Sequence, residues 1–191
     1  GIEHSGVVDA VGENVDPKIL GQRVHSRNNF GGNAEYSIAS IDRIKPFPPE
    51  LDWIKGTVYG GMTHTAFHVL NTAVQVNSSS TCLFHSAAGA IGIMLTQIAK
   101  EAGATVIGLC SKQKFNYAKK FGADYLIDYN EKDWPKKAME FNDGRGFKII
   151  VDGNQGEQSD HNLDIVTPGG HIIYIGATAG YSAKKVDVSK L

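Results

Sequence analysis

The chain has 191 residues, of which 41% are hydrophobic and 20% are charged, with a formal net charge of −1. Because Lys and Arg are balanced by Asp and Glu, and no long basic block occurs, the composition argues against a nucleic-acid partner. No apolar run approaches the roughly 20 residues that cross a bilayer. A signal-peptide pattern is also missing, so we expect a cytoplasmic protein with no membrane partner.

The cysteines and the two ends of the chain give further expectations. Cys82 and Cys110 both lie in apolar, strand-like runs, which favours buried thiols over a disulfide. The chain starts with Gly1 inside a strand-like pattern, and the stretch Val186–Leu191 has no terminal character. We therefore expect a chain that is truncated at both ends.

The first part of the chain has the pattern of a β domain. Strands are predicted over Gly6–Gly12, Gln22–Ser26 and Ala34–Ala39, where apolar and polar residues alternate between glycine-rich turns. Prolines at 46, 48 and 49 then interrupt the pattern. We place the domain boundary there, with a partial β domain over residues 1–47 and a second domain over residues 48–191.

From about residue 50 helices and strands alternate. The pattern predicts helices over residues 51–58, 62–70, 90–102, 114–121 and 132–141, and strands over 81–84, 105–109, 125–127, 147–151 and 170–175. Such alternation implies right-handed crossovers and a doubly wound, parallel α/β sheet of the Rossmann type. A ligand of this fold binds at the carboxyl ends of the strands.

The stretch Leu83–Gly92 joins a predicted buried strand to a helix through a turn of small residues. This arrangement brings a diphosphate to free N–H groups at a helix N-terminus. Gly89 would let the backbone approach the diphosphate, and Gly92 would let the helix pack on the strand, whereas Ala87 replaces the first glycine of G-x-G-x-x-G. Taken alone, the turn fits a cofactor site and an ordinary strand–helix turn equally well.

The end of the second predicted strand indicates which nucleotide would bind. An acidic residue for the adenosine ribose is expected about 20 residues past the glycines. The segment Leu109–Lys114 has none, and offers Ser111 and Lys114 instead. These residues would attract a 2′-phosphate, and Tyr129 could close over it, which predicts NADPH. The alternative is a solvated, lysine-rich helix start.

Several motifs resemble those of a known superfamily. Gly1–Gly6, followed by Gly12 and Val15, is similar to the signature of medium-chain dehydrogenases/reductases, with Ile2 where zinc alcohol dehydrogenases have a metal-binding His. The resemblance to the zinc-independent quinone oxidoreductase branch rests on four further motifs: Leu83–Gly92, Gln97–Lys100, Gly122–Asp124 and Ile127–Tyr129. Together the motifs cover nearly the whole chain.

The resemblance implies a GroES-like β domain, a Rossmann domain and a homodimer formed through the cofactor domain. It implies that NADPH binds through Thr65, Gly176 and Ala177 on the nicotinamide side, with Asn154 as a further candidate. The other implied contacts are Ala88, Gly89, Ala90 and Ile91 for the diphosphate, and Ser111, Lys114 and Tyr129 for the 2′-phosphate. Cys110 could replace Ser111 if the loop register differs by one residue.

Metal and acid–base chemistry have little support in the sequence. Catalytic zinc needs three protein ligands, but Ile2 is not a ligand and no cysteine lies near 60–65. His64 and His68 lack the Glu of an H-E-x-x-H motif, and we interpret them as packing or cofactor-neighbouring residues. His85 is interpreted as a hydrogen-bonded wall residue. We assign no catalytic residue and no metal.

The resulting hypothesis is a zinc-independent oxidoreductase that transfers hydride from NADPH to a small quinone-type acceptor. The acceptor would lie near Asn28, Asn29 and Thr65. An enoyl or alkenal reductase is the alternative reaction, and it would need a proton donor that the sequence does not identify. A further alternative is a truncated chain that binds NADPH without turnover or serves as a binding or structural module.

Overall fold

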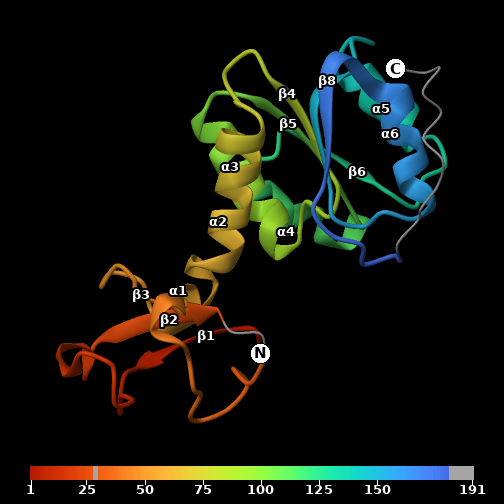
Figure 1. The fold of residues 1–191 in the computed structure, drawn as a ribbon. Helices are drawn as coiled ribbons and strands as arrows, with labels where there is room; N and C mark the ends of the chain where they lie inside the picture. The colour runs from red at the N-terminus through yellow and green to blue at the C-terminus, as the bar shows by residue number, and fades with distance from the viewer. Residues whose placement is uncertain (28–29, 181–191) are drawn as a thin grey trace. The chain divides into compact units, whose positions relative to one another are not determined.

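The computed structural model describes residues 1–27 and 30–180, and the chain divides into two compact units, Gly1–Thr65 and Ala66–Leu191 (Figure 1). Asn28, Asn29 and the stretch Val186–Leu191 thus lie outside the described residues. The division falls after the predicted boundary at residue 47, because helix α1 (Trp53–Tyr59) packs against the first β-sheet. Ser5 Oγ, for example, donates to the Trp53 carbonyl at 2.7 Å.

The first unit contains a three-stranded antiparallel sheet in the order β1-β2-β3. Its strands are β1 (Glu3–Val7), β2 (Arg23–Arg27) and β3 (Ile44–Pro46), and two 3-10 turns lie at Pro17–Ile19 and Ile41–Arg43. The Asp52 carboxylate caps α1 by accepting from the Lys55 N–H at 2.8 Å. Pro46 is tolerated at the end of an edge strand, which needs no donor on its outer side.

Two strand predictions in this unit are wrong in detail. β1 spans Glu3–Val7, so it starts and ends earlier than the predicted Gly6–Gly12. Residues 34–39 form no strand, and Ile38 in this segment is 97% exposed. The alternation of apolar and polar residues was the only basis for that prediction, and alternation does not specify how backbone groups pair. β3 was not predicted, because the prolines at its end and just after it were interpreted as the end of the β pattern.

The second unit contains a parallel five-stranded sheet in the order β6-β5-β4-β7-β8, which confirms the predicted fold class. The strands are β4 (Thr81–Phe84), β5 (Thr105–Cys110), β6 (Tyr125–Asp128), β7 (Phe147–Asp152) and β8 (Val166–Tyr174). This is the order of a doubly wound fold, in which the chain changes direction across the sheet between the first and fourth strands. Here these strands are β4 and β7.

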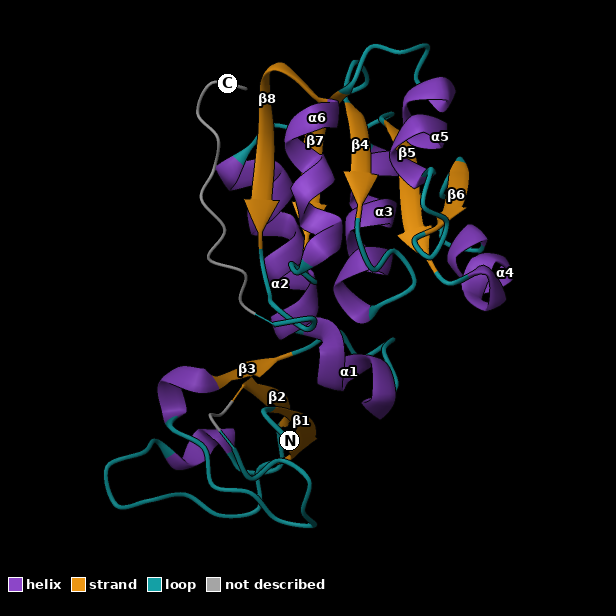
Figure 2. Ribbon diagram, turned by 90° about the vertical axis from the view of Figure 1, so that its right-hand side faces the viewer, coloured by secondary structure: helices purple, strands orange, loops and turns teal. Residues whose placement is uncertain are grey.

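Helices cover both faces of this sheet (Figures 1 and 2). Side chains alternate along each strand, so Cys82 and Phe84 join the apolar cluster under helix α3, whereas Leu83 joins the cluster that includes Trp134 of α5. Both clusters contain side chains that are almost fully buried. The two layers make β4 the central, fully covered strand of the unit.

The helices largely follow the predicted pattern. They are α2 (Gly61–Phe67), a π-helical turn (His68–Ala73), α3 (Ala90–Glu101), a 3-10 turn (Lys112–Lys114) with α4 (Phe115–Lys119), α5 (Trp134–Phe141), a 3-10 turn (Glu157–His161) and α6 (Asn162–Ile165). Gly103 and Gly122 follow α3 and α4 with φ of +79° and +102°, a conformation that favours glycine. Among the described residues, none of the helices has the length and apolar character needed to cross a membrane.

Candidate functional site

The candidate site lies at the carboxyl ends of the strands of the second unit. In a sheet of this order, a ligand binds in the crevice where the chain changes direction, which here lies beside the ends of β4 and β7. Except for Thr65, every predicted cofactor residue follows one of the strands at this end or begins α3. Thr65 belongs to the first unit, where its hydroxyl donates to the Gly61 carbonyl at 2.9 Å.

The turn between β4 and α3 is so tightly packed that it admits only small residues. Ser86 adopts a left-handed φ of +53°, and the Ala87 N–H donates to the Leu109 carbonyl at 3.0 Å. A Cβ on Gly92 would collide with the Ser86 carbonyl and would lie 2.8 Å from Ala87 Cα. Ala87 itself lies against Gly108, where a Cβ would come within 2.6 Å of the Ala87 Cβ.

The start of α3 has the properties that a diphosphate requires. Gly89 is its N-cap and makes no side-chain capping bond, while the Gly89 N–H donates to the Ser86 carbonyl at 2.7 Å. The next N–H groups, at Ala90, Ile91 and Gly92, have no acceptor within the helix. These free N–H groups form the positive end of the helix dipole, which attracts an anion. The turn therefore fits a diphosphate group.

Ser111 and Lys114 lie together after β5. The Lys114 N–H donates to the Ser111 carbonyl at 2.8 Å, and the Lys114 side chain is exposed. Tyr129 directly follows β6, is half-buried and packs against the cluster under α5. The ends of these neighbouring strands therefore hold the residues that we predicted for a 2′-phosphate.

Sequence reasoning missed a carboxylate next to this position. Asp128, the last residue of β6, accepts the Lys112 N–H at 3.3 Å and the Asn130 N–H at 3.0 Å. Hydrogen bonds from Asn130 and Lys112 lower the pKa of Asp128 against the opposing effect of burial. Burial and this Asp128 charge raise the pKa of Cys110, which pairs with Asp128 in the sheet. The sequence could have indicated this carboxylate. Asp128 ends a predicted strand, and adjacent parallel strands end at the same edge of a sheet, so Asp128 could be expected near the residues that follow β5.

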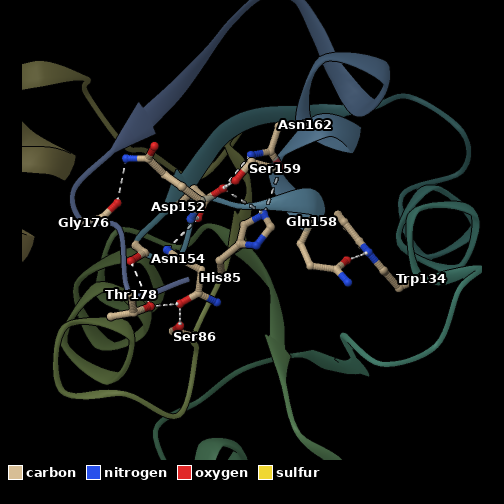
Figure 3. Close-up of polar contacts among 12 residues, drawn as sticks. His85, Ser86, Trp134, Asp152, Asn154, Gln158, Ser159, Asn162, Gly176 and Thr178 are labelled. Atoms are coloured by element: carbon tan, nitrogen blue, oxygen red, sulfur yellow. Dashed lines mark hydrogen bonds and ion pairs between the residues drawn. The ribbon is translucent and has the colours of Figure 1, made fainter. Parts of the chain in front are cut away.

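A second missed feature is a buried polar network around Asp152, the last residue of β7 (Figure 3). One carboxylate oxygen accepts from the Asn154 and Gln155 N–H groups at 2.8 and 3.0 Å. The other accepts from Ser159 Oγ and, at 2.9 Å, from Asn162 Nδ2. Burial raises the pKa of Asp152, but His85 and these hydrogen bonds outweigh it and the pKa lies below its usual range.

His85 joins this network from the end of β4. Its Nε2 lies 2.8 Å from Asn162 Oδ1, and Trp134 packs edge-on against its ring. Because the Asn162 amide nitrogen faces a carboxylate, the amide oxygen faces His85, and His85 Nε2 must be the donor. Burial lowers the pKa of His85 although Asp152 and Asn162 act in the other direction. His85 is thus buried and hydrogen-bonded, as predicted.

The ends of β4, β7 and β8 are joined by side-chain hydrogen bonds. Asn154 Oδ1 accepts from Ser86 Oγ at 2.6 Å and from Thr178 Oγ1 at 2.8 Å. Gln155 Nε2 donates to the Gly176 carbonyl at 2.9 Å, and a Cβ on Gly176 would lie 2.9 Å from the Gly153 carbonyl. The predicted nicotinamide-side residues Asn154, Gly176 and Ala177 thus lie on loops that contact one another (Figure 3).

Neither the thiols nor the histidines form a further centre. Cys82 and Cys110 are free and buried, as predicted, and burial raises the pKa of Cys82 to about 12. Among residues 1–27 and 30–180, no group of three or more His, Cys, Asp or Glu residues could hold a metal ion. A hollow of about 710 Å³ lies in the first unit beside β1, and none of the predicted cofactor residues lines it.

Comparison with known proteins places the chain in a family. Residues 90–191 match the family described as zinc-binding dehydrogenase, which is just over half of the chain. Quinone oxidoreductase from Sus scrofa is 28% identical over 179 residues, which covers 93% of this chain and 54% of that protein. The chain thus spans about half the length of the curated relatives that it matches.

Solved structures agree in fold over the whole chain. Quinone oxidoreductase of Pseudomonas syringae is 29% identical, with a TM-score of 0.90, and the match covers 100% of this chain and 60% of that one. Escherichia coli quinone oxidoreductase, solved in complex with NADPH, is 25% identical with a TM-score of 0.90, over 99% of this chain and 58% of that one. The chain therefore belongs to the zinc-binding dehydrogenase family, within the quinone oxidoreductase-like branch of the medium-chain dehydrogenase/reductase superfamily.

Proposed function

We propose that this protein is a zinc-independent, NADPH-dependent oxidoreductase that transfers hydride to a quinone-type acceptor. The observation that carries the proposal is the β4–α3 turn, where Gly92 permits no side chain and uncapped N–H groups begin a long helix. The NADPH complex of the Escherichia coli relative supports the choice of nucleotide. NADPH would supply the hydride, and a quinone can accept it without a metal because its carbonyl groups are electron sinks.

The chain itself would bind and orient the cofactor. The N–H groups of Ala90 and Ile91 would bind the diphosphate, and Ala88 and Gly89 would allow its close approach. Ser111, Lys114 and Tyr129 would hold the 2′-phosphate, and Asn154, Gly176, Ala177 and Thr65 would lie on the nicotinamide side. Holding the reacting ring in one orientation and excluding water is the main contribution that such a site makes to the rate.

The cofactor assignment is tested with Lys114→Ala. A charge-assisted hydrogen bond contributes roughly 1.5–3 kcal/mol, so the Kd for NADPH should rise about tenfold or more while the Kd for NADH stays the same. Lys119→Ala, an equal charge change at the far end of helix α4, is the matched control and should alter neither value. Equal affinities of the unmodified protein for NADH and NADPH would refute the 2′-phosphate site.

The acceptor is tested by following NADPH absorbance with quinones, alkenals and enoyl thioesters. We expect turnover with quinones. Oxidation by an alkenal or enoyl thioester alone would favour the alternative reductase, and cofactor binding without any turnover would favour a binding module. We also propose a homodimer formed through the cofactor domain, which sedimentation velocity would detect.

A further inference from the structure

The carboxylate of Asp152 is a buried negative charge with no cation beside it. Its side chain has 0% relative exposure. Within the described part of the chain, the only basic nitrogen within 4.0 Å is His85 Nε2, at 3.9 Å. That nitrogen donates its proton to Asn162 Oδ1, and burial lowers the pKa of His85, so the ring is neutral at neutral pH. At neutral pH the Asp152 charge is therefore stabilised by hydrogen bonds, and His85 adds an ion pair only when its ring is protonated.

All of the hydrogen-bond partners of Asp152 act as donors. Two backbone N–H groups, the Ser159 hydroxyl and the Asn162 amide nitrogen point at its oxygens (Figure 3). A protonated carboxyl group would instead need an acceptor for its own proton. Three of the four partners can only donate, and together with the lowered pKa of Asp152 this geometry favours the ionised form. A buried charge of this kind acts on its surroundings with little screening by solvent.

The position of this charge relative to the proposed cofactor follows from the sheet order. The diphosphate turn follows β4, and the adenosine half lies toward β5 and β6, so the nicotinamide half lies over the ends of β7 and β8. Asp152 is the last residue of β7, and its carbonyl accepts from the Ile175 N–H at 2.9 Å. The carboxylate thus contacts the loop that carries Asn154, and Gln155 of the same loop donates to the Gly176 carbonyl.

We propose that Asp152 is a positioning residue whose fixed negative charge favours the oxidised, positively charged nicotinamide over the neutral reduced ring. This inference rests on the proposed function. Hydride transfer to a quinone moves two electrons and one proton, the quinone takes its second proton from solvent, and the nicotinamide ring becomes positively charged. A fixed negative charge at the end of β7, near where that ring would bind, would stabilise the charge that develops during the transfer.

The test compares the affinities of NADP⁺ and NADPH in the whole protein, by calorimetry or fluorescence titration. The two ligands differ only at the ring, so the ratio of their Kd values cancels changes in how the rest of the cofactor binds. Asp152→Asn keeps the size and removes the charge. It should raise the ratio of the NADP⁺ Kd to the NADPH Kd by roughly three- to tenfold.

Two further variants make the test independent of folding defects. Asn154→Asp adds a negative charge two residues further along and should lower the same ratio. The variant should keep its local structure, because the oxygen of this side chain already accepts from two hydroxyl groups. Ser159→Ala removes a donor to Asp152 but keeps the charge, so the ratio should stay within about twofold of the original.

The outcomes separate this inference from the proposed function. If the unmodified protein binds neither nucleotide, the proposed function is wrong and the inference is wrong with it. If it binds both, but the ratio does not respond to Asp152→Asn or to Asn154→Asp, the charge has no role and only the inference is overturned. Should Asp152→Asn fail to fold, an unchanged ratio in Asn154→Asp overturns the inference, because the ring then does not sense a charge at this end of β7, and a lower ratio supports it.

Discussion

Gly92 is the residue at which the β4–α3 turn has no room for even one methyl group. A Cβ there would lie 2.8 Å from Ala87 Cα and 2.9 Å from the Ala87 carbonyl carbon, both of them backbone atoms that cannot move independently. We expect Gly92→Ala to reduce the free energy of unfolding by about 1–3 kcal/mol and to weaken NADPH binding, because α3 must shift away from the turn.

Urea unfolding followed by circular dichroism, together with NADPH titration, would measure both effects. Gly153→Ala is the matched control for stability, because a Cβ there would make only ordinary contact, 3.7 Å from Ile175 Cγ1. Equal stability and affinity of the Gly92→Ala variant and the unmodified protein would show that the turn is more adaptable than this packing implies.

Asp128 gives a second prediction for a single residue. Its negative charge lies at the end of β6, beside the strand end that leads to Ser111 and Lys114. A carboxylate close to a bound 2′-phosphate repels it, so Asp128→Asn should strengthen NADPH binding several-fold and leave NADH binding nearly unchanged. Comparing the two Kd values measures this effect. Weaker NADH binding in the variant would instead assign Asp128 to the ribose hydroxyls.

At the scale of elements, the Asp152–Asn162–His85 network connects β4, β7 and α6. The pKa of His85 is lower in the folded protein than the value of about 6.5 expected when unfolded. Between these values the unfolded state binds more protons, so the stability due to neutral His85 is complete above about pH 6.5 and falls below it. The maximum slope is about 1.4 kcal/mol per pH unit.

His85→Gln can still donate to Asn162 Oδ1 but does not titrate. We therefore expect its stability to fall less steeply than that of the unmodified protein as the pH drops from 6.5 to 5. Asp152, whose pKa is also lowered, loses its contribution only below about pH 4, outside this window. Thermal or urea unfolding across the pH range would reveal the difference, and parallel profiles would contradict it.

At the scale of the whole molecule, we expect activity without zinc. The resemblance implies that Ile2 stands where zinc alcohol dehydrogenases have a metal-binding His, and a hydrocarbon side chain cannot coordinate a metal. Quinone reduction by NADPH should therefore be unchanged after treatment with a chelator. Elemental analysis of the purified protein would provide the independent measurement, and one zinc ion per chain would contradict the assignment.

Much of the second unit was predictable from local pattern. β4 matches its predicted range, and α3 begins where predicted, because the apolar period changes from strand to helix at the small-residue turn. The first unit was less predictable. Residues 34–39 alternate like a strand but do not form one, and β3 was obscured by prolines that an edge position tolerates.

The sequence alone determined the fold class and the small-residue turn, because periodicity and residue size are local properties. Only the tertiary structure showed that Asp128 lies beside the Ser111 segment, and that Asp152 is buried against Asn162 and His85. Such contacts join residues far apart in the chain, and they follow from the order of the strands in the sheet, which periodicity does not specify.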